Sequence, residues 1–336
     1  DYHPGRCLVE SRQKTDLARK FSKVTEVFKY KAPLKEKIKF IKYKKNYAVN
    51  YYHYLGITER MNYSPKVDLL IIGSDEVFNC VQDNTNVGFS PELFGKDNNA
   101  SRVITYAASF GNTTIEKLEK YNIKEKISEY LSKLNDISVR DTNSGKIVSS
   151  LTGSEPQCNL DPVLVYDYIG KCSKIPDSVK EKNYLLLYGY SGRFSESECN
   201  VIREYANKRN LKVFCIGGVQ NACDKFIDCN PFEVIAYFKC ADAIVTDTFH
   251  GTIMSIITHN KFVSLVRKNG YGNSEKLIDL LERLNLKNRI IRNMNSLEEM
   301  MSESISYKET DKVIQEERNK AYEYLKSHIR ENFNAI

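Results

Sequence analysis

The residues most able to do chemistry lie at one junction, ADAIVTDTFHGTIMSI, over residues 241–256. An apolar run typical of a buried strand ends there, and His250, Gly251 and Thr252 open an apolar helix. The first turn of a helix carries N–H groups and the positive end of the helix dipole, so it favours an anion. Gly251 permits close approach of a ligand, Thr252 adds a hydroxyl, and His250 can transfer protons near neutral pH. The structural alternative, equally weighted on spacing alone, is a histidine that caps the helix and a glycine that packs.

Further polar residues follow predicted strands in the first half of the chain. Ser74 and Asp75 follow the apolar run of IIGSDEVF, Ser109 lies in AASFGN, and Arg140 ends ISVRD. Asp75 could orient sugar hydroxyls or act as a base, and it could equally cap the next turn. The guanidinium of Arg140 can donate two parallel hydrogen bonds to a carboxylate or phosphate of a ligand. The structural alternative to this binding role is an ion pair with a nearby aspartate.

Several common enzyme classes are disfavoured by missing motifs. The chain has no GxGxxG after a strand and no GxxxxGK[ST], which argues against a dinucleotide or P-loop enzyme. GxSxG and HExxH are absent as well. The nine cysteines form no CxxC pair, so no metal site is predicted, and their scatter fits a reducing cytoplasm. No apolar run approaches the ~18 residues of a membrane span.

The elements that must position these residues alternate along the chain. Continuous apolar runs such as NYLLLYGY, LKVFCIGG, ADAIVT and KFVSLVR alternate with helical patterns in the second half, and the first half alternates less regularly. This pattern predicts an α/β fold with parallel sheets covered on both faces. We expect an N-terminal domain over residues 1–175, a C-terminal domain over residues 176–308, and a helix over residues 309–336 that packs back on the first domain.

The stretches DLLIIGSDEVF, RVITYAASFG, ISVRD, NLDPVLV and DAIVTDTFHGTIMSI, in this order, resemble the polysaccharide pyruvyl transferase family. The match is closest to its bacterial capsule and exopolysaccharide branch. The resemblance implies two Rossmann-like parallel-sheet domains that face each other across a cleft, as in GT-B glycosyltransferases, with the acceptor on the N-terminal side and the donor on the C-terminal side. The opening DYHPG resembles the end of a second strand, so the first βα unit of that fold is expected to be missing.

The resemblance also implies an activity. Family members move the enolpyruvyl group of phosphoenolpyruvate to a sugar hydroxyl and close it as a cyclic pyruvate ketal, with no cofactor beyond this donor. His250 matches the family's histidine and is expected to donate the proton, with Asp75 as a second catalytic candidate. Some members carry Arg where Thr248 stands, which removes one anchor for the donor. Arg140 matches the family's strand-end arginine and is expected to bind substrate. The other predicted substrate-binding residues rest on their positions at strand ends and helix starts rather than on the family, and they are Gly251, Thr252, Ser74, Ser109, Thr248 and Lys276.

Two other functions remain open at this stage. A glycosyltransferase that uses a sugar nucleotide could share the same two-domain frame, because one fold hosts many functions. An inactive saccharide-binding homologue is the third reading, motivated by Thr248 and by the missing segment. Binding of phosphoenolpyruvate rather than a nucleotide sugar, and release of phosphate, would distinguish the three.

The net charge of +7 is concentrated in a lysine-rich run that begins at Lys29 and ends at Lys45. Leu34, Ile38 and Ile41 fall at helical spacing there and leave lysines on the other faces. The plain interpretation is a solvated amphipathic helix or linker, and the alternative is peripheral contact with an anionic membrane. No nucleic-acid motif accompanies the charge. The expected partners are phosphoenolpyruvate and a saccharide acceptor, either free or lipid-linked. The expected location is the cytoplasm, with peripheral contact at the inner face of the cell membrane as the alternative that the lysine-rich run offers.

Overall fold

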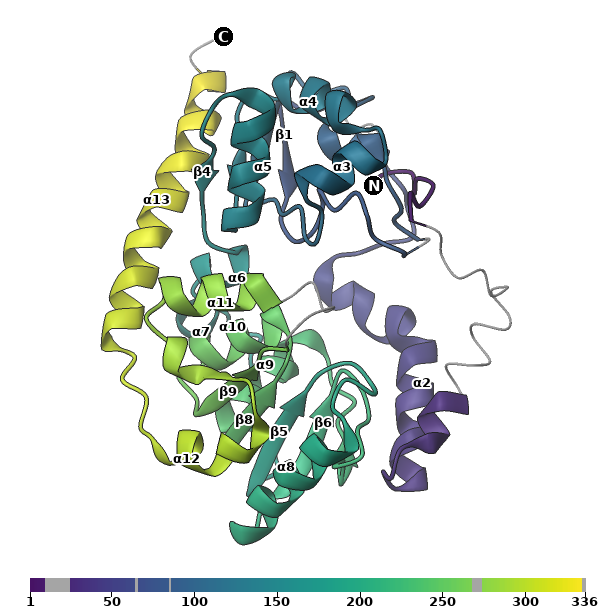
Figure 1. The fold of residues 1–336 in the computed structure, drawn as a ribbon, viewed down its shortest axis with the longest axis vertical. Helices are drawn as coiled ribbons and strands as arrows, with labels where there is room; N and C mark the ends of the chain where they lie inside the picture. Colours follow the sequence, from purple (N-terminus) through teal and green to yellow (C-terminus); the bar gives the residue numbers. More distant parts are fainter. Residues whose placement is uncertain (10–24, 64–65, 85, 268–273, 334–336) are drawn as a thin grey trace. The chain divides into compact units, whose positions relative to one another are not determined.

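The computed structural model describes residues 1–9, 25–63, 66–84, 86–267 and 274–333 (Figure 1). The chain divides into two compact units. The first comprises Asp1–Gln13, Arg60–Tyr166 and Asp311–Ile336, and the second comprises Lys14–Glu59 and Asp167–Thr310. Each unit has its own parallel β-structure and its own buried apolar core.

The first unit contains four parallel strands. Strand β1 (Leu69–Gly73) pairs with β2 (Arg102–Tyr106), and β3 (Ser138–Val139) pairs with β4 (Gln157–Cys158). Two isolated parallel bridges, Ile104 with Asp136 and Ala108 with Val139, join the β2 segment to the β3 segment. The carboxyl ends of all four strands therefore lie at one edge. The other elements are η2 (Pro91–Phe94), α3 (Ile115–Lys120), α4 (Lys124–Ser132), α5 (Thr142–Thr152), α6 (Pro162–Val165) and most of α13 (Lys308–Phe333).

The second unit is built on a six-stranded parallel sheet of order β10-β9-β8-β5-β6-β7. Its strands are β5 (Tyr184–Tyr188), β6 (Lys212–Ile216), β7 (Lys225–Phe226), β8 (Ala243–Thr246), β9 (Phe262–Leu265) and β10 (Ile290–Ile291). The other elements are α2 (Leu34–Tyr51), η1 (Tyr52–Leu55), α7 (Tyr168–Lys171), α8 (Glu196–Lys208), α9 (Pro231–Cys240), α10 (Phe249–Ile257), α11 (Ser274–Arg283), η3 (Lys287–Arg289), η4 (Met294–Ser296) and α12 (Leu297–Ser302). This strand order is that of a Rossmann-like sheet.

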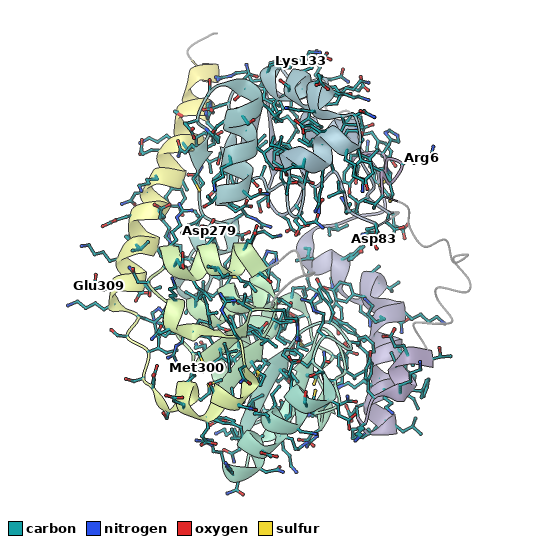
Figure 2. The ribbon with its side chains drawn as sticks, viewed as in Figure 1. Arg6, Asp83, Lys133, Asp279, Met300 and Glu309 are labelled. Carbon is teal, nitrogen blue, oxygen red and sulfur yellow. The ribbon has the colours of Figure 1, made fainter. Side chains whose placement is uncertain are left out.

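The predicted α/β class with parallel sheets is confirmed. Helix α9 begins with a capping box, in which the Asn230 side chain accepts from the Glu233 N–H and the Glu233 carboxylate accepts from the Asn230 N–H. Strands β4 and β7 have only two residues each, so they leave too short an apolar run to be recognised in the sequence. Figure 2 draws the side chains and labels Met300 on α12, which packs against the core of the second unit.

The units divide the chain differently from the expected boundary in two segments. Residues 167–175 group with the second unit. Residues 14–59 group with the second unit because α2 packs beside β7. The ring of Phe40 meets that of Phe226 edge-on at 5.1 Å, and the Glu36 carboxylate accepts the Phe226 N–H at 2.9 Å. In α13, residues from Asp311 onward group with the first unit, where the Tyr324 hydroxyl donates to the Thr105 carbonyl.

Across the described residues, no helix combines the length and the apolar character needed to cross a bilayer. All nine cysteines are described, and none of them forms a disulfide bond. Cys215 is fully buried in the core, whereas Cys240 is only partly buried at the end of α9.

Candidate active site

The second sheet has a topological switch point between β5 and β8. Strands β6 and β7 continue on one side of this pair, and β9 and β10 continue on the other. Crossovers to opposite sides leave a crevice beyond the carboxyl ends of the two central strands, and open α/β sheets bind ligands there. The segment after β5 leads to Arg193, and the segment after β8 leads to Asp247 and His250.

A buried ion pair connects these two segments. Asp247 directly follows β8, its side chain is fully buried, and its Oδ2 accepts from the Arg193 Nε at 2.7 Å. The other oxygen, Oδ1, has no hydrogen-bond partner among the residues that the structure describes. The side chain of Arg193 keeps 21% of its surface exposed, so its positive charge reaches solvent at the switch point. A buried carboxylate that holds an arginine in this way fixes the orientation of the guanidinium.

A second arginine flanks the same carboxylate. Arg267, just after β9, has its Nε 3.7 Å from the Asp247 Oδ2 and donates from NH1 to Glu198 at 2.7 Å. Burial opposes ionisation of Glu198, but hydrogen bonds from Arg267 and from the Ser195 N–H outweigh it and lower the pKa of this carboxyl. The Glu198 side chain also completes the capping box of α8. The network therefore ties the ends of β8 and β9 to the start of α8.

The first turn of α10 is capped from within the chain. Thr248 is the N-cap, and its Oγ1 accepts the Gly251 N–H at 3.0 Å. The Thr252 N–H donates to the Thr248 carbonyl, and the buried Thr252 hydroxyl lies 2.6 Å from the Ser264 hydroxyl. The backbone N–H groups of Gly251 and Thr252, which the sequence predicts as donors to a ligand, thus donate to Thr248 in this structure. The positive end of the α10 dipole still points at the switch point.

Gly251 is required by packing. A Cβ at this position would lie 2.2 Å from the Thr246 Oγ1, 2.6 Å from the Thr248 Oγ1 and 2.7 Å from the Tyr188 Cδ1. No side chain fits at such distances, so the glycine allows α10 to start directly against the ends of β5 and β8.

His250 is the second residue of α10 and is half-buried, so its imidazole is not sealed in the interior. Its ring meets that of Phe249 edge-on, with centroids 5.6 Å apart. Lys276, in the first turn of α11, is only 4% exposed. The structure therefore gathers His250, Thr248, Gly251 and Thr252 in one place and puts Lys276 on the next helix.

The first unit gathers the other predicted residues at its own strand ends. The Arg140 side chain, just after β3, is almost completely buried and donates from NH1 to Asp161 at 2.7 Å and from NH2 to Asp75 at 2.8 Å. Asp161 is equally buried, but the Asp75 side chain is 68% exposed. Two carboxylates already balance the guanidinium, so in this structure Arg140 holds Asp75 at the surface.

Ser109 and Ser74 differ in their access to solvent. Ser109 is fully buried, and its hydroxyl donates to Asp141 at 2.6 Å. Ser74 lines a largely apolar cavity of about 280 Å³ beside the end of β1, together with Tyr166 and Tyr322. These two tyrosines are exposed in part, and such aromatic faces suit the apolar faces of sugar rings.

The sequence interpretation gave Arg193, Asp247 and Arg267 no role. A signal was present, because each follows an apolar strand run within a few residues, in LYGYSGR, IVTD and FVSLVR.

Among the residues that the structure describes, no group of three or more His, Cys, Asp or Glu side chains could hold a metal ion.

Known proteins resemble this chain in structure and in sequence family. A solved structure of a mutant O-GlcNAc transferase from Thermobaculum terrenum is 11% identical, with a TM-score of 0.35, and the match covers 78% of this chain and 49% of that one. The chain thus spans about half the length of that structure. The search of curated proteins found no match to this chain. The model of the polysaccharide pyruvyl transferase family matches residues 14–269, which include the switch point and the strand ends of the first unit, and the chain belongs to this family.

Proposed function

We propose that this chain transfers the enolpyruvyl group of phosphoenolpyruvate to a sugar and closes it as a pyruvate ketal, in the synthesis of a capsular polysaccharide or exopolysaccharide. The observation that carries the proposal is the cluster of Arg193, Asp247 and His250 at the switch point of the second sheet. This cluster lies within the residues that match the family.

The donor is assigned to the second unit. Phosphoenolpyruvate is a small trianion, so its site needs fixed positive charge. Arg193, oriented by Asp247, and the positive end of α10 supply that charge. An anion at the first turn of α10 would compete with the Thr248 hydroxyl for the Gly251 N–H. Arg193 binds the anionic donor in place of the arginine that some family members carry at the position of Thr248.

The reaction requires protonation of C3 of phosphoenolpyruvate, addition of one sugar hydroxyl to C2, and displacement of phosphate from C2 by a second hydroxyl. His250 gives a proton to C3 of phosphoenolpyruvate, which makes C2 cationic, and a sugar hydroxyl attacks C2. A second hydroxyl then displaces phosphate from C2 and closes the ketal. Two hydroxyl protons are released, of which one restores His250 and the other leaves with the phosphate. The products are the pyruvylated saccharide and inorganic phosphate.

The acceptor is assigned to the first unit. Asp75 is exposed and held by Arg140, so it can accept hydrogen bonds from sugar hydroxyls or take a proton from one. The cavity beside Ser74, with two exposed tyrosine rings, offers an apolar surface to a saccharide. We infer a lipid-linked saccharide as acceptor and the cytoplasm as the compartment, which suits nine cysteines that form no disulfide bond.

The test is phosphate release from phosphoenolpyruvate with a panel of galactose and N-acetylhexosamine saccharides. Phosphate release that depends on the acceptor, with a matching ketal product, is the expected result. A thermal-shift comparison with UDP, GDP and CMP sugars runs in parallel, because only a true donor stabilises the fold by mass action. Stabilisation by a nucleotide sugar and not by phosphoenolpyruvate would overturn the proposal in favour of glycosyl transfer.

A further inference from the structure

Helix α2 packs on the second unit through an aromatic face. Phe40, Tyr43, Tyr47 and Tyr51 recur at intervals of three and four residues, so they share one side of the helix. Phe40 and Tyr43 contact the ring of Phe226, and the Tyr51 hydroxyl donates to Asp228. This aromatic face fixes which side of α2 points outward.

The outward side carries apolar residues that are well exposed among the described residues. Leu34 is 61% exposed, Ile38 42%, Val49 84% and Tyr52 41%. Leu34, Ile38 and Val49 stand at positions i, i+4 and i+15, which fall on one side of an α-helix, and Tyr52 follows directly in η1. We call these four residues and Lys45, which shares their side at i+11, the outer face of α2. Single exposed apolar residues are common, but a stripe along one helix indicates an interaction surface.

The charge on the same helix is of one sign. Its exposed charged residues are all lysines, namely Lys35, Lys42, Lys44 and Lys45. Within the described residues none of the four forms an ion pair, unlike Lys31 just before the helix, which pairs with Glu196. The one acidic residue of α2, Glu36, is buried and bound to a backbone N–H. The surface beside the apolar stripe is therefore positive without internal neutralisation.

We propose that the outer face of α2 docks on a membrane surface rich in anionic lipid. An amphipathic helix binds such a surface when apolar side chains enter the boundary between headgroups and acyl chains while lysines meet anionic headgroups. Leu55 and Ile57, both about half exposed just after the helix, extend the apolar stripe. A symmetric contact with a second copy fits less well, because it would bring the same lysines face to face.

The test is co-sedimentation of the full chain with vesicles of phosphatidylcholine alone or mixed with phosphatidylglycerol. We expect binding to the mixed vesicles at low salt, weaker binding as salt rises, and little binding to neutral vesicles. Replacing Lys35, Lys42 and Lys45 by Gln should lower the partition coefficient by about 100-fold, because each lysine near an anionic surface contributes roughly five-fold. Leu34→Ser with Ile38→Ser should weaken binding at every salt concentration.

A matched control removes the same charge elsewhere. Lys171, Lys180 and Lys182 are exposed on the second unit, and their replacement by Gln should leave vesicle binding nearly unchanged. All altered residues are at the surface, and an unchanged melting temperature verifies folding.

Three results would overturn the proposal: no binding to anionic vesicles at low salt, equal loss in the control, or self-association that the α2 variants abolish. Donor and acceptor are left out of the assay, so its outcome is independent of the proposed reaction.

Discussion

Gly251→Ala should destabilise the second unit, although the substitution lies in a helix where alanine is normally favoured. On helix propensity alone, alanine would gain about 1 kcal/mol over glycine. The surroundings decide otherwise, because the new Cβ would meet Thr246, Thr248 and Tyr188 at less than 3 Å. Two of the three contacts are with hydroxyls tied to the strand end and to the helix cap.

The loss of stability in Gly251→Ala is the cost of overpacking minus the gain in helix propensity. Overpacking a buried site costs about 1–3 kcal/mol and occasionally more, and three contacts this short place Gly251→Ala at the upper end. Thr246 is fully buried on the central strand β8, so it cannot turn into solvent to relieve the contact. After the propensity gain is subtracted, a net loss of about 2 kcal/mol remains, which corresponds to a drop of roughly 4–8 °C in melting temperature.

Gly145→Ala is the matched control. Gly145 lies inside α5, and a Cβ there would meet no atom within 4 Å. This variant should gain about 1 kcal/mol from propensity, opposite in sign to Gly251→Ala. Urea denaturation followed by circular dichroism, together with scanning calorimetry, compares both variants with the parent chain.

The double variant Gly251→Ala with Thr246→Ala removes the closest of the three contacts. It should recover part of the loss, as a favourable coupling in a double-mutant cycle. If Gly251→Ala were as stable as the parent, the packing account of this glycine would be wrong.

Three further variants test the two sites. Arg193→Gln should raise the KM for phosphoenolpyruvate at least ten-fold in steady-state assays and lower the free energy of unfolding by about 1–3 kcal/mol, because the buried Asp247 loses its hydrogen-bonded partner and keeps Arg267, 3.7 Å away; an unchanged KM would remove Arg193 from the donor site. Asp75→Asn should reduce kcat/KM for the acceptor on the order of 100-fold, while the thermal shift by phosphoenolpyruvate stays as in the parent; a lost thermal shift would contradict the assignment to the acceptor. In Glu198 the folded state has the lower pKa, so its contribution is present above the ordinary value of 4.5 and is lost as the pH falls through the lowered pKa. Urea midpoints of Glu198→Gln should therefore be lower than those of the parent at neutral pH and converge with them in acid, and a constant difference would argue against the ion pair with Arg267.

The sequence predicts the elements of the second sheet well because their signals are local. A continuous apolar run such as Ala243–Thr246 is typical of a strand in a parallel sheet that is covered on both faces. The cap, proline and glutamate at the start of α9 specify that helix start within four residues. Neither signal depends on knowing the tertiary structure.

The pairings at the site depend on strand order, which local patterns do not encode. Arg193 and Asp247 are 54 residues apart, and they meet because β5 lies next to β8. Arg140 looks like an anion ligand in the sequence, but Asp75 and Asp161 arrive from two other strand ends and balance its charge. The Thr252 hydroxyl likewise faces Ser264 on the neighbouring strand.

The faces of α2 illustrate the same limit. Leu34 and Ile38 have the spacing of a buried stripe, yet they lie exposed because Phe40 and Tyr43 take the inner side against Phe226. Which of two apolar stripes is buried depends on the surface that receives the helix, and here that surface comes from β7, far along the chain.

Phosphate release by the parent chain and by His250→Ala, measured with phosphoenolpyruvate and a saccharide that the parent uses, tests the central claim most directly. We predict release that depends on the acceptor in the parent and a rate lower by about 100-fold or more in His250→Ala, the usual scale for a lost proton donor. His259→Asn, just beyond the other end of the same helix, should keep the parent's rate. Equal turnover by His250→Ala and the parent would contradict the account.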